Sequence, residues 1–266
     1  MVTHQQRLAA ARDAITWISS RSAADMERPV PNCPGWSVYN AVVHMGRVGV
    51  AWQSMIEASP EDPESRDRGY ADAEARGSGH SPDVLASWAL AAIDALDADE
   101  DRSSYFSMAG GHGTVGLWGR HVAAELSIHR IDVEQALGAP IAMSNEMAVD
   151  AIEYTAEWFL PAMARATDTD PGALAISSGP EGANTATLRA AANDQQPLAQ
   201  ISGAPIEVLL ALWNRPHGDI TIDGDRDVFD TWCSQPGRLP IRHLGLIPSG
   251  VAFRRPGAVA VLRLMA

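Results

Sequence analysis

Apolar residues recur at intervals of three or four along the N-terminal two thirds of the chain, the spacing of one face of an α-helix. Leu8, Ala11, Ile15 and Ile18 form the first such stripe. Serine residues stand where N-caps are expected, and Gly138 stands where a helix should end. The pattern predicts five helices, over residues 5–20, 37–58, 82–97, 116–137 and 145–166.

Two stretches between these helices lack the helical pattern. Residues 59–80 are polar and rich in Pro, Glu, Asp and Arg, which predicts a surface loop. Residues 109–113 are rich in glycine and predict a turn before the fourth helix.

After residue 168 the sequence pattern changes to short runs typical of β-strands. Strands are expected over 174–177 and 219–222, with a helix over 205–213 capped by Ser202 or Gly203 and another over 225–234. The fold class is therefore α+β, mainly α: a four-helix bundle followed by a small α/β domain. We expect the bundle over 1–168, the α/β domain over 169–236, and a tail of unknown structure over 237–266, which is basic and has no acidic residue.

Charge and composition exclude some classes of protein. The net charge of −13 argues against nucleic acid or an anionic membrane as partner. No apolar run approaches the ~20 residues of a membrane span, and the polar N-terminus does not resemble a signal peptide, so we expect a cytoplasmic protein. The two cysteines, Cys33 and Cys233, are expected to be free thiols, with a nucleophilic role for Cys33 as the alternative.

The fourth helix carries polar residues where core is expected. Its apolar face is formed by Trp118, Val122, Leu126, Val133 and Ala136, and Glu125 and His129 fall inside that face, one turn apart. A carboxylate facing a core is costly unless it is paired, protonated or bound to a metal. A hydrogen-bonded Glu–His pair would also satisfy this pattern.

His44 on the second helix favours metal binding over a simple hydrogen-bonded Glu–His pair. It borders an apolar stripe, so it could meet Glu125 and His129 across the bundle. Two His and one Glu leave a fourth position open, as catalytic zinc sites do. We therefore expect His44, Glu125 and His129 to bind one divalent metal, most simply zinc.

Other polar residues near the pair are candidates for supporting roles. His121, one turn before Glu125, is a candidate fourth ligand, outer-shell residue, proton carrier or satisfied core histidine. Asp132 could orient a ligand imidazole or pair with an arginine. Four further histidines lie in polar or Gly-rich surroundings and are expected to be exposed: His4, His80, His112 and His243.

The chain resembles the mycothiol-dependent maleylpyruvate isomerase family in two segments, residues 33–38 followed by His44, and residues 125–134. The resemblance extends through 201–205, 209–215 and 222–225, and covers about 1–235. It implies a DinB-like bundle that binds zinc through His44, Glu125 and His129. It also implies that Arg215 faces the active site. The absence of lysine among the 20 basic residues indicates a GC-rich genome and suits an actinobacterial source, where mycothiol is abundant.

The implied chemistry is activation of mycothiol at the metal for attack on an electrophilic small molecule. Arg215 would bind a carboxylate of the substrate or of the thiol. Because residues 59–80 and the tail suggest a specialised substrate, S-transfer or thiol exchange is slightly favoured over cis–trans isomerisation of the maleylpyruvate type.

Two alternatives from other classes stay open. A metal-dependent hydrolase would activate water and would need a general base, for which His121 and Asp132 are candidates. A non-catalytic zinc-binding module would have a closed fourth position, with His121 as the fourth ligand.

Overall fold

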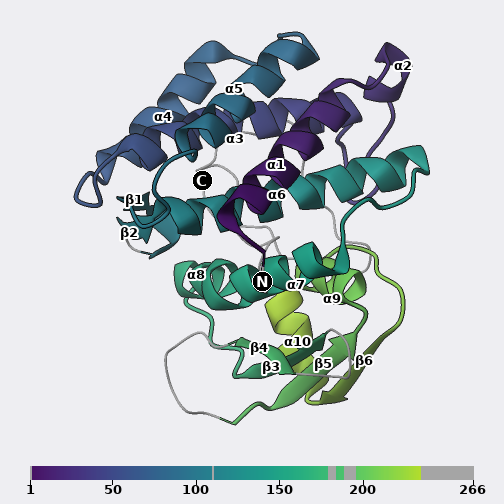
Figure 1. The fold of residues 1–266 in the computed structure, drawn as a ribbon. Coiled ribbons are helices and arrows are strands. Elements are labelled where there is room, and N and C mark those ends of the chain that lie inside the picture. Colours follow the sequence, from purple (N-terminus) through teal and green to yellow (C-terminus); the bar gives the residue numbers. More distant parts are fainter. Residues whose placement is uncertain (1, 110, 179–183, 189–195, 235–266) are drawn as a thin grey trace, which may run out of the picture.

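The computed structural model describes residues 2–109, 111–178, 184–188 and 196–234, and its helices lie close to the predicted ones (Figure 1). The helices of the N-terminal part are α1 (His4–Ser19), α2 (Ala23–Met26), α3 (Val38–Glu57), α4 (Glu64–Arg76), α5 (Pro82–Ala95) and α6 (Val115–Leu137). They are followed by α7 (Asn145–Tyr154), the π-helical turn η2 (Thr155–Phe159), α8 (Leu160–Ala166), α9 (Pro205–Leu212) and α10 (Arg226–Cys233).

The bundle is built around α3, which packs against α4, α5 and α6, while α1 packs against α5 and α6. Glycine allows the closest of these approaches. A Cβ on Gly46 would lie 2.6 Å from the backbone oxygen of Leu85, and one on Gly49 would lie 2.6 Å from Cα of Ala89. The backbones of α3 and α5 are therefore in near contact, which holds α3 rigidly in place.

A four-stranded sheet forms the C-terminal part, in the order β4-β3-β5-β6. Its strands are β3 (Leu174–Ser178), β4 (Asn184–Leu188), β5 (Ala199–Gly203) and β6 (Ile220–Gly224). The central strands β3 and β5 are parallel, and both outer strands pair antiparallel. In Figure 1, α7, α8 and α9 lie between the bundle helices and this sheet. The observed architecture confirms the predicted fold class. Helix α8 ends at Ala166 and the first strand of the sheet begins at Leu174, while the division into domains stays a prediction.

The prediction of a surface loop over 59–80 is wrong, because α4 occupies Glu64–Arg76. Its buried face consists of Ser65, Gly69 and Ala73 at helical spacing. These side chains are too small to give an apolar stripe, yet they let α4 lie close to α3: a Cβ on Gly69 would be 2.8 Å from Cα of Ala51. The polar composition belongs to the remaining, exposed faces of the helix.

Several smaller expectations also need correction. A hairpin of β1 (Ser103–Phe106) and β2 (Gly111–Thr114), joined by the 3₁₀ turn η1 (Ser107–Ala109), precedes α6 and was not predicted. Ser202 and Gly203 belong to β5, and Ala204 holds the N-cap position of α9. The fifth predicted helix is interrupted by η2, which accommodates one extra residue per turn.

Of the histidines expected to be exposed, His4 is buried and its Nε2 lies 2.9 Å from the backbone oxygen of Leu96. His112 is exposed and His80 is half-buried, while His243 and the predicted tail lie outside the described residues. Both cysteines are free and buried, as predicted. Among the described residues, no helix is long and apolar enough to cross a membrane.

Candidate metal centre

His44 is positioned by the well-formed start of α3. Ser37 caps this helix, accepting a hydrogen bond from the backbone N–H of Asn40, whose side chain accepts in return from the N–H of Ser37. This reciprocal capping fixes the first turn of α3. His44 follows two turns later on a side of the helix that faces α6.

Glu125 and His129 lie in the middle of α6, one turn apart. His129 is buried, and the side chain of Glu125 is 15% exposed. The Oε1 atom of Glu125 lies 3.4 Å from Nε2 of His44 and 3.5 Å from Nε2 of His129. The structure thus brings the three predicted ligands together at a single carboxylate oxygen.

These spacings fit a metal better than hydrogen bonds. A tetrahedral ion with bonds of about 2.0–2.1 Å holds its ligand atoms about 3.3–3.4 Å apart, close to the observed 3.4 and 3.5 Å. Hydrogen bonds between nitrogen and oxygen are usually about 2.7–3.2 Å long. The ligand atoms of His44, Glu125 and His129 all lie within 4.8 Å of one another, and no fourth His, Cys, Asp or Glu of the described residues joins this group.

The electrostatics of His44 and Glu125 suit ligation, whereas the apo form favours a protonated His129 that has to release its Nε2 proton when a metal binds. Burial lowers the pKa of His44, which favours the neutral imidazole that a metal requires. Burial would raise the pKa of Glu125, but hydrogen bonding to His129 and His44 holds it well below its usual value, so the carboxylate is charged. For His129, the effect of burial is outweighed by its hydrogen bonds to Asp132, Cys33 and Glu125, which raise its pKa well above the usual value.

Trp36 forms one wall of the centre. Its ring stacks on His129 with centroids 5.8 Å apart and lies tilted against His44 at 5.1 Å. The indole is only 6% exposed, and its Nε1 has no hydrogen-bond partner among the described residues. The ring therefore packs against both imidazoles and restricts their rotation.

On the Nδ1 side of His129, the carboxylate of Asp132 accepts hydrogen bonds from several donors. His129 Nδ1 lies 3.1 Å from Oδ2, and the guanidinium of Arg215 donates from Nε at 2.8 Å and from Nη2 at 2.9 Å. Asn32 donates to Oδ1 at 3.0 Å, and the thiol of Cys33 lies 3.5 Å from Oδ2. Asp132 thus combines both roles that the sequence left open, orientation of an imidazole and pairing with an arginine.

Cys33, His129 and Asp132 form a second group with metal-ligand spacing. Arg215 makes this group a poor metal site, because its positive guanidinium already occupies both oxygens of Asp132 and its Nη2 lies 3.7 Å from the sulfur of Cys33. A cation there would have to displace this ion pair. The first group has no such competitor, so it is the candidate centre.

His121 does not join the three ligands. Its Nδ1 lies 2.7 Å from the hydroxyl of Tyr154, and its ring packs against Trp52 and Trp118. Burial lowers the pKa of His121 to about 4, so the ring is neutral near pH 7. Its predicted part in catalysis stays a prediction.

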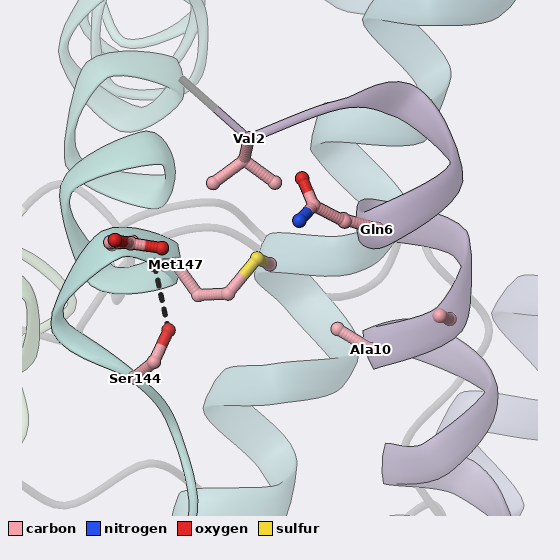
Figure 2. A pocket seen from close by; sticks show the side chains of 7 residues that line it. Val2, Gln6, Ala10, Ser144 and Met147 are labelled. Carbon is pink, nitrogen blue, oxygen red and sulfur yellow. Dashed lines mark hydrogen bonds between the residues drawn. The ribbon is translucent and has the colours of Figure 1, made fainter.

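A separate hollow lies between the N-terminal ends of α1 and α7 (Figure 2). Val2, Gln6 and Ala10 line it from the side of α1, with Ser144 and Met147 from that of α7. It contains none of the residues of the candidate centre, and its lining lacks the paired titratable groups of a reactive site.

Sequence reasoning missed the parts of the centre contributed by residues 32–36. Asn32, Cys33 and Trp36 lie in a turn before α3, held by hydrogen bonds from the N–H of Val30 to Trp36 and from the N–H of Trp36 to Cys33. Cys33 and Trp36 lie in the segment that carries the family resemblance, and Cys33 was considered only as a nucleophile, while Asn32 left no signal in the sequence.

Comparison with known proteins agrees with the family resemblance of the sequence. A family model described as the mycothiol maleylpyruvate isomerase N-terminal domain matches residues 7–134. A crystal structure of the mycothiol-dependent maleylpyruvate isomerase aligns with a TM-score of 0.54 at 16% sequence identity, over 84% of this chain and 95% of the other. A histidine-to-alanine mutant of the mycothiol-dependent maleylpyruvate isomerase gives a TM-score of 0.55 with the same identity and coverage. At this identity the solved structures show a shared fold, and no curated protein sequence matches the chain.

Proposed function

Since residues 7–134 match the family model of the mycothiol maleylpyruvate isomerase N-terminal domain, we propose that the chain is an enzyme that activates mycothiol at a metal held by His44, Glu125 and His129. The thiol then attacks an electrophilic carbon of a small-molecule substrate. The observation that carries this proposal is the convergence of three ligand atoms within 4.8 Å, with no fourth protein ligand among the described residues.

Zinc is the metal we propose. Two imidazole nitrogens and one carboxylate oxygen are a common ligand set of catalytic zinc, and the distances from Glu125 to His44 and to His129 are close to those between ligand atoms of a tetrahedral zinc ion. When bound, the metal would lower the pKa of a thiol at its open position.

The residues of this chain prepare the centre for that chemistry. Asp132 lies 3.1 Å from Nδ1 of His129 and would hold a proton there, which leaves Nε2, on the side of Glu125, to ligate the metal. Trp36 excludes water from one side of the two imidazoles. We keep His121, one turn from Glu125, as the candidate proton carrier, but the burial that lowers its pKa to about 4 makes it a weak base toward a thiol.

Arg215 was expected to bind a carboxylate of the substrate or of mycothiol. An arginine has five N–H donors. In Arg215, two of them bond to Asp132, one points to the sulfur of Cys33, and one bonds to the backbone oxygen of Trp213. A single N–H on Nη1 is left for a ligand. A direct contact with substrate therefore remains compatible with the structure but would be made by one hydrogen bond.

Two outcomes can follow attack by the thiol. If the adduct persists, the reaction is S-transfer or thiol exchange; if the adduct rotates and expels the thiol, the reaction is cis–trans isomerisation. The preference for transfer depended partly on a long loop at 59–80, and α4 removes that argument. The proposed function is therefore the first step common to both outcomes.

Incubation with mycothiol and a panel of electrophiles, followed by mass spectrometry, tests this proposal and separates the outcomes. Transfer gives a product heavier by the bound thiol, whereas isomerisation gives a product of unchanged mass with a different retention time. Both must depend on mycothiol and on the metal. Absence of any thiol-dependent product across conjugated and epoxide electrophiles would count against the proposal.

The alternatives give different results in the same assay. A hydrolase would turn over an ester or amide without added thiol. A non-catalytic module would give no product with any substrate and would need a fourth protein ligand, a part that His121, paired with Tyr154, does not take here.

A further inference from the structure

We propose that Arg215 is a positioning residue for the metal centre, which acts through Asp132 on the ligand His129. The C-terminal part of the chain would thereby set the metal affinity of the bundle. This inference rests on the proposed function, since it takes His44, Glu125 and His129 as the metal ligands. It assigns to Arg215 a role other than contact with a substrate.

The first step is the match between the guanidinium and the carboxylate. Nε and Nη2 of Arg215 donate to the two oxygens of Asp132 at 2.8 and 2.9 Å, the fork-like geometry that fixes both groups in one plane. The side chain of Asp132 is fully buried and that of Arg215 is 12% exposed. An ion pair so far from water holds its geometry firmly, and loss of one partner leaves the other as an uncompensated buried charge.

The second step leads from Asp132 to the ligand. Oδ2 of Asp132 accepts from Nη2 of Arg215 and also lies 3.1 Å from Nδ1 of His129. With the carboxylate fixed, a metal-ligating His129 would keep its proton on Nδ1 and offer to the ion its Nε2, which lies 3.5 Å from Oε1 of Glu125. Without Arg215, the carboxylate could rotate away from Nδ1, and the imidazole would lose its preferred tautomer.

The two histidine ligands differ in what surrounds their Nδ1 atoms. Nδ1 of His44 is buried and has no hydrogen-bond partner among the described residues, so His44 is held by packing against Trp36. Of the two ligand imidazoles, His129 is the one whose Nδ1, the nitrogen turned away from Glu125, lies against a charged partner in the described structure. Its orientation is therefore the one that a remote residue can control.

The third step concerns how Arg215 reaches the bundle. Helix α9 ends at Leu212 with Trp213 as its C-cap. Asn214 adopts a left-handed conformation with φ of 57°, which turns the chain so that the N–H of Arg215 bonds to the oxygen of Leu210 at 2.8 Å. The indole of Trp213 donates to Thr155 at 3.0 Å and stacks on Phe159 at 4.5 Å. The turn that aims Arg215 is thus anchored to the helices between bundle and sheet.

Metal affinity measured on the apo form of the full chain, by competition with a chromogenic zinc chelator, tests this inference. We expect Arg215→Met and Asp132→Asn each to raise the Kd for zinc about 10- to 100-fold, the range for loss of an outer-shell partner. The double variant should be little weaker than either single variant, because both remove the same support. Arg215→Lys keeps the charge without the fork and should fall between the wild type and Arg215→Met.

Arg7→Met is the matched control. Arg7 makes a similar two-point pair with Asp150, at 2.9 and 2.6 Å, which joins α1 to α7 and touches no ligand of the centre. It should lower the melting temperature and leave the Kd for zinc unchanged. If Arg215→Met does not fold, Asp132→Asn and Arg215→Lys carry the test.

The possible results separate this inference from the proposed function. If the wild-type chain binds no zinc, the proposed centre is wrong and the inference falls with it. If the wild type binds zinc and Arg215→Met, Arg215→Lys and Asp132→Asn all bind it within about twofold of the wild type, the inference alone is overturned. Unchanged zinc affinity with a raised KM for a carboxylate-bearing substrate would show that Arg215 binds substrate instead.

Discussion

Trp36 and His129 stack face to face, with ring centroids 5.8 Å apart and planes inclined by 21°. The same indole also contacts His44, so an ion held by the two imidazoles would lie beside it. This contact joins the turn before α3 to the middle of α6 and supplies an optical reporter for the centre.

We predict that cobalt or copper quenches part of the tryptophan fluorescence through Trp36. Titration of the apo protein should give a saturable decrease that reaches its end at one metal per chain. In Trp36→Phe most of this decrease should disappear, whereas Trp88→Phe, whose ring on α5 packs against Arg76 and His80, should keep it. An equal decrease in both variants would place the metal elsewhere.

Removal of the central carboxylate should abolish metal binding. Glu125→Gln keeps the shape of the side chain and removes the charge shared by His44 and His129. Elemental analysis of purified protein should give about one zinc per chain for the wild type and almost none for the variant. Glu157→Gln, which removes an exposed partner of Arg120, is the control and should retain the metal.

His121 should make the apo protein sensitive to mild acid. Its pKa of about 4 in the folded chain lies below the value of about 6.5 in an unfolded chain, so the unfolded state binds the proton first as the pH falls. The stability that this residue contributes is present above about pH 6.5 and is lost between about pH 6.5 and 4, by up to about 3 kcal/mol.

Urea unfolding of apo protein between pH 7.5 and 4.5 measures this effect. The wild type should lose more stability over this range than His121→Asn, which has no titrating group but can still bond to Tyr154. Parallel pH profiles for the two proteins would refute the assignment of a buried neutral imidazole.

Gly69 tests the packing of α4 on α3. Alanine is the better helix former, but its Cβ would lie 2.8 Å from Cα of Ala51 and 2.9 Å from the oxygen of Ala51. Overpacking should outweigh the gain in propensity, and we expect Gly69→Ala to lower the free energy of unfolding by about 1–2 kcal/mol. Gly79→Ala, with nothing within 4 Å of its Cβ, should be neutral. A neutral Gly69→Ala would contradict the observed contact between the helices.

The helices and the grouping of His44, Glu125 and His129 could be predicted because each leaves a local signal. Large apolar residues mark the faces of α1, α3, α5 and α6, and Glu125 and His129 stand out as polar residues within such a face. Helix α4 could not be predicted because its contact with α3 depends on Gly and Ala, which do not form an apolar stripe.

The surroundings of the ligands could not be predicted from local patterns. Asp132 and Arg215 are 83 residues apart, and Cys33 and Arg215 are 182 apart, so their contacts arise only when the C-terminal part packs on the bundle. The sequence left Asp132 with two alternatives, and the fold satisfies both because a carboxylate has two oxygens and several acceptor positions.

The central claim is that a thiol is activated at the metal bound by His44, Glu125 and His129. Absorption spectra of the cobalt-substituted protein, recorded before and after addition of mycothiol, test it most directly. The account predicts a new sulfur-to-cobalt charge-transfer band with mycothiol, and none with Glu125→Gln. A cobalt spectrum that stays unchanged at saturating mycothiol would contradict the account.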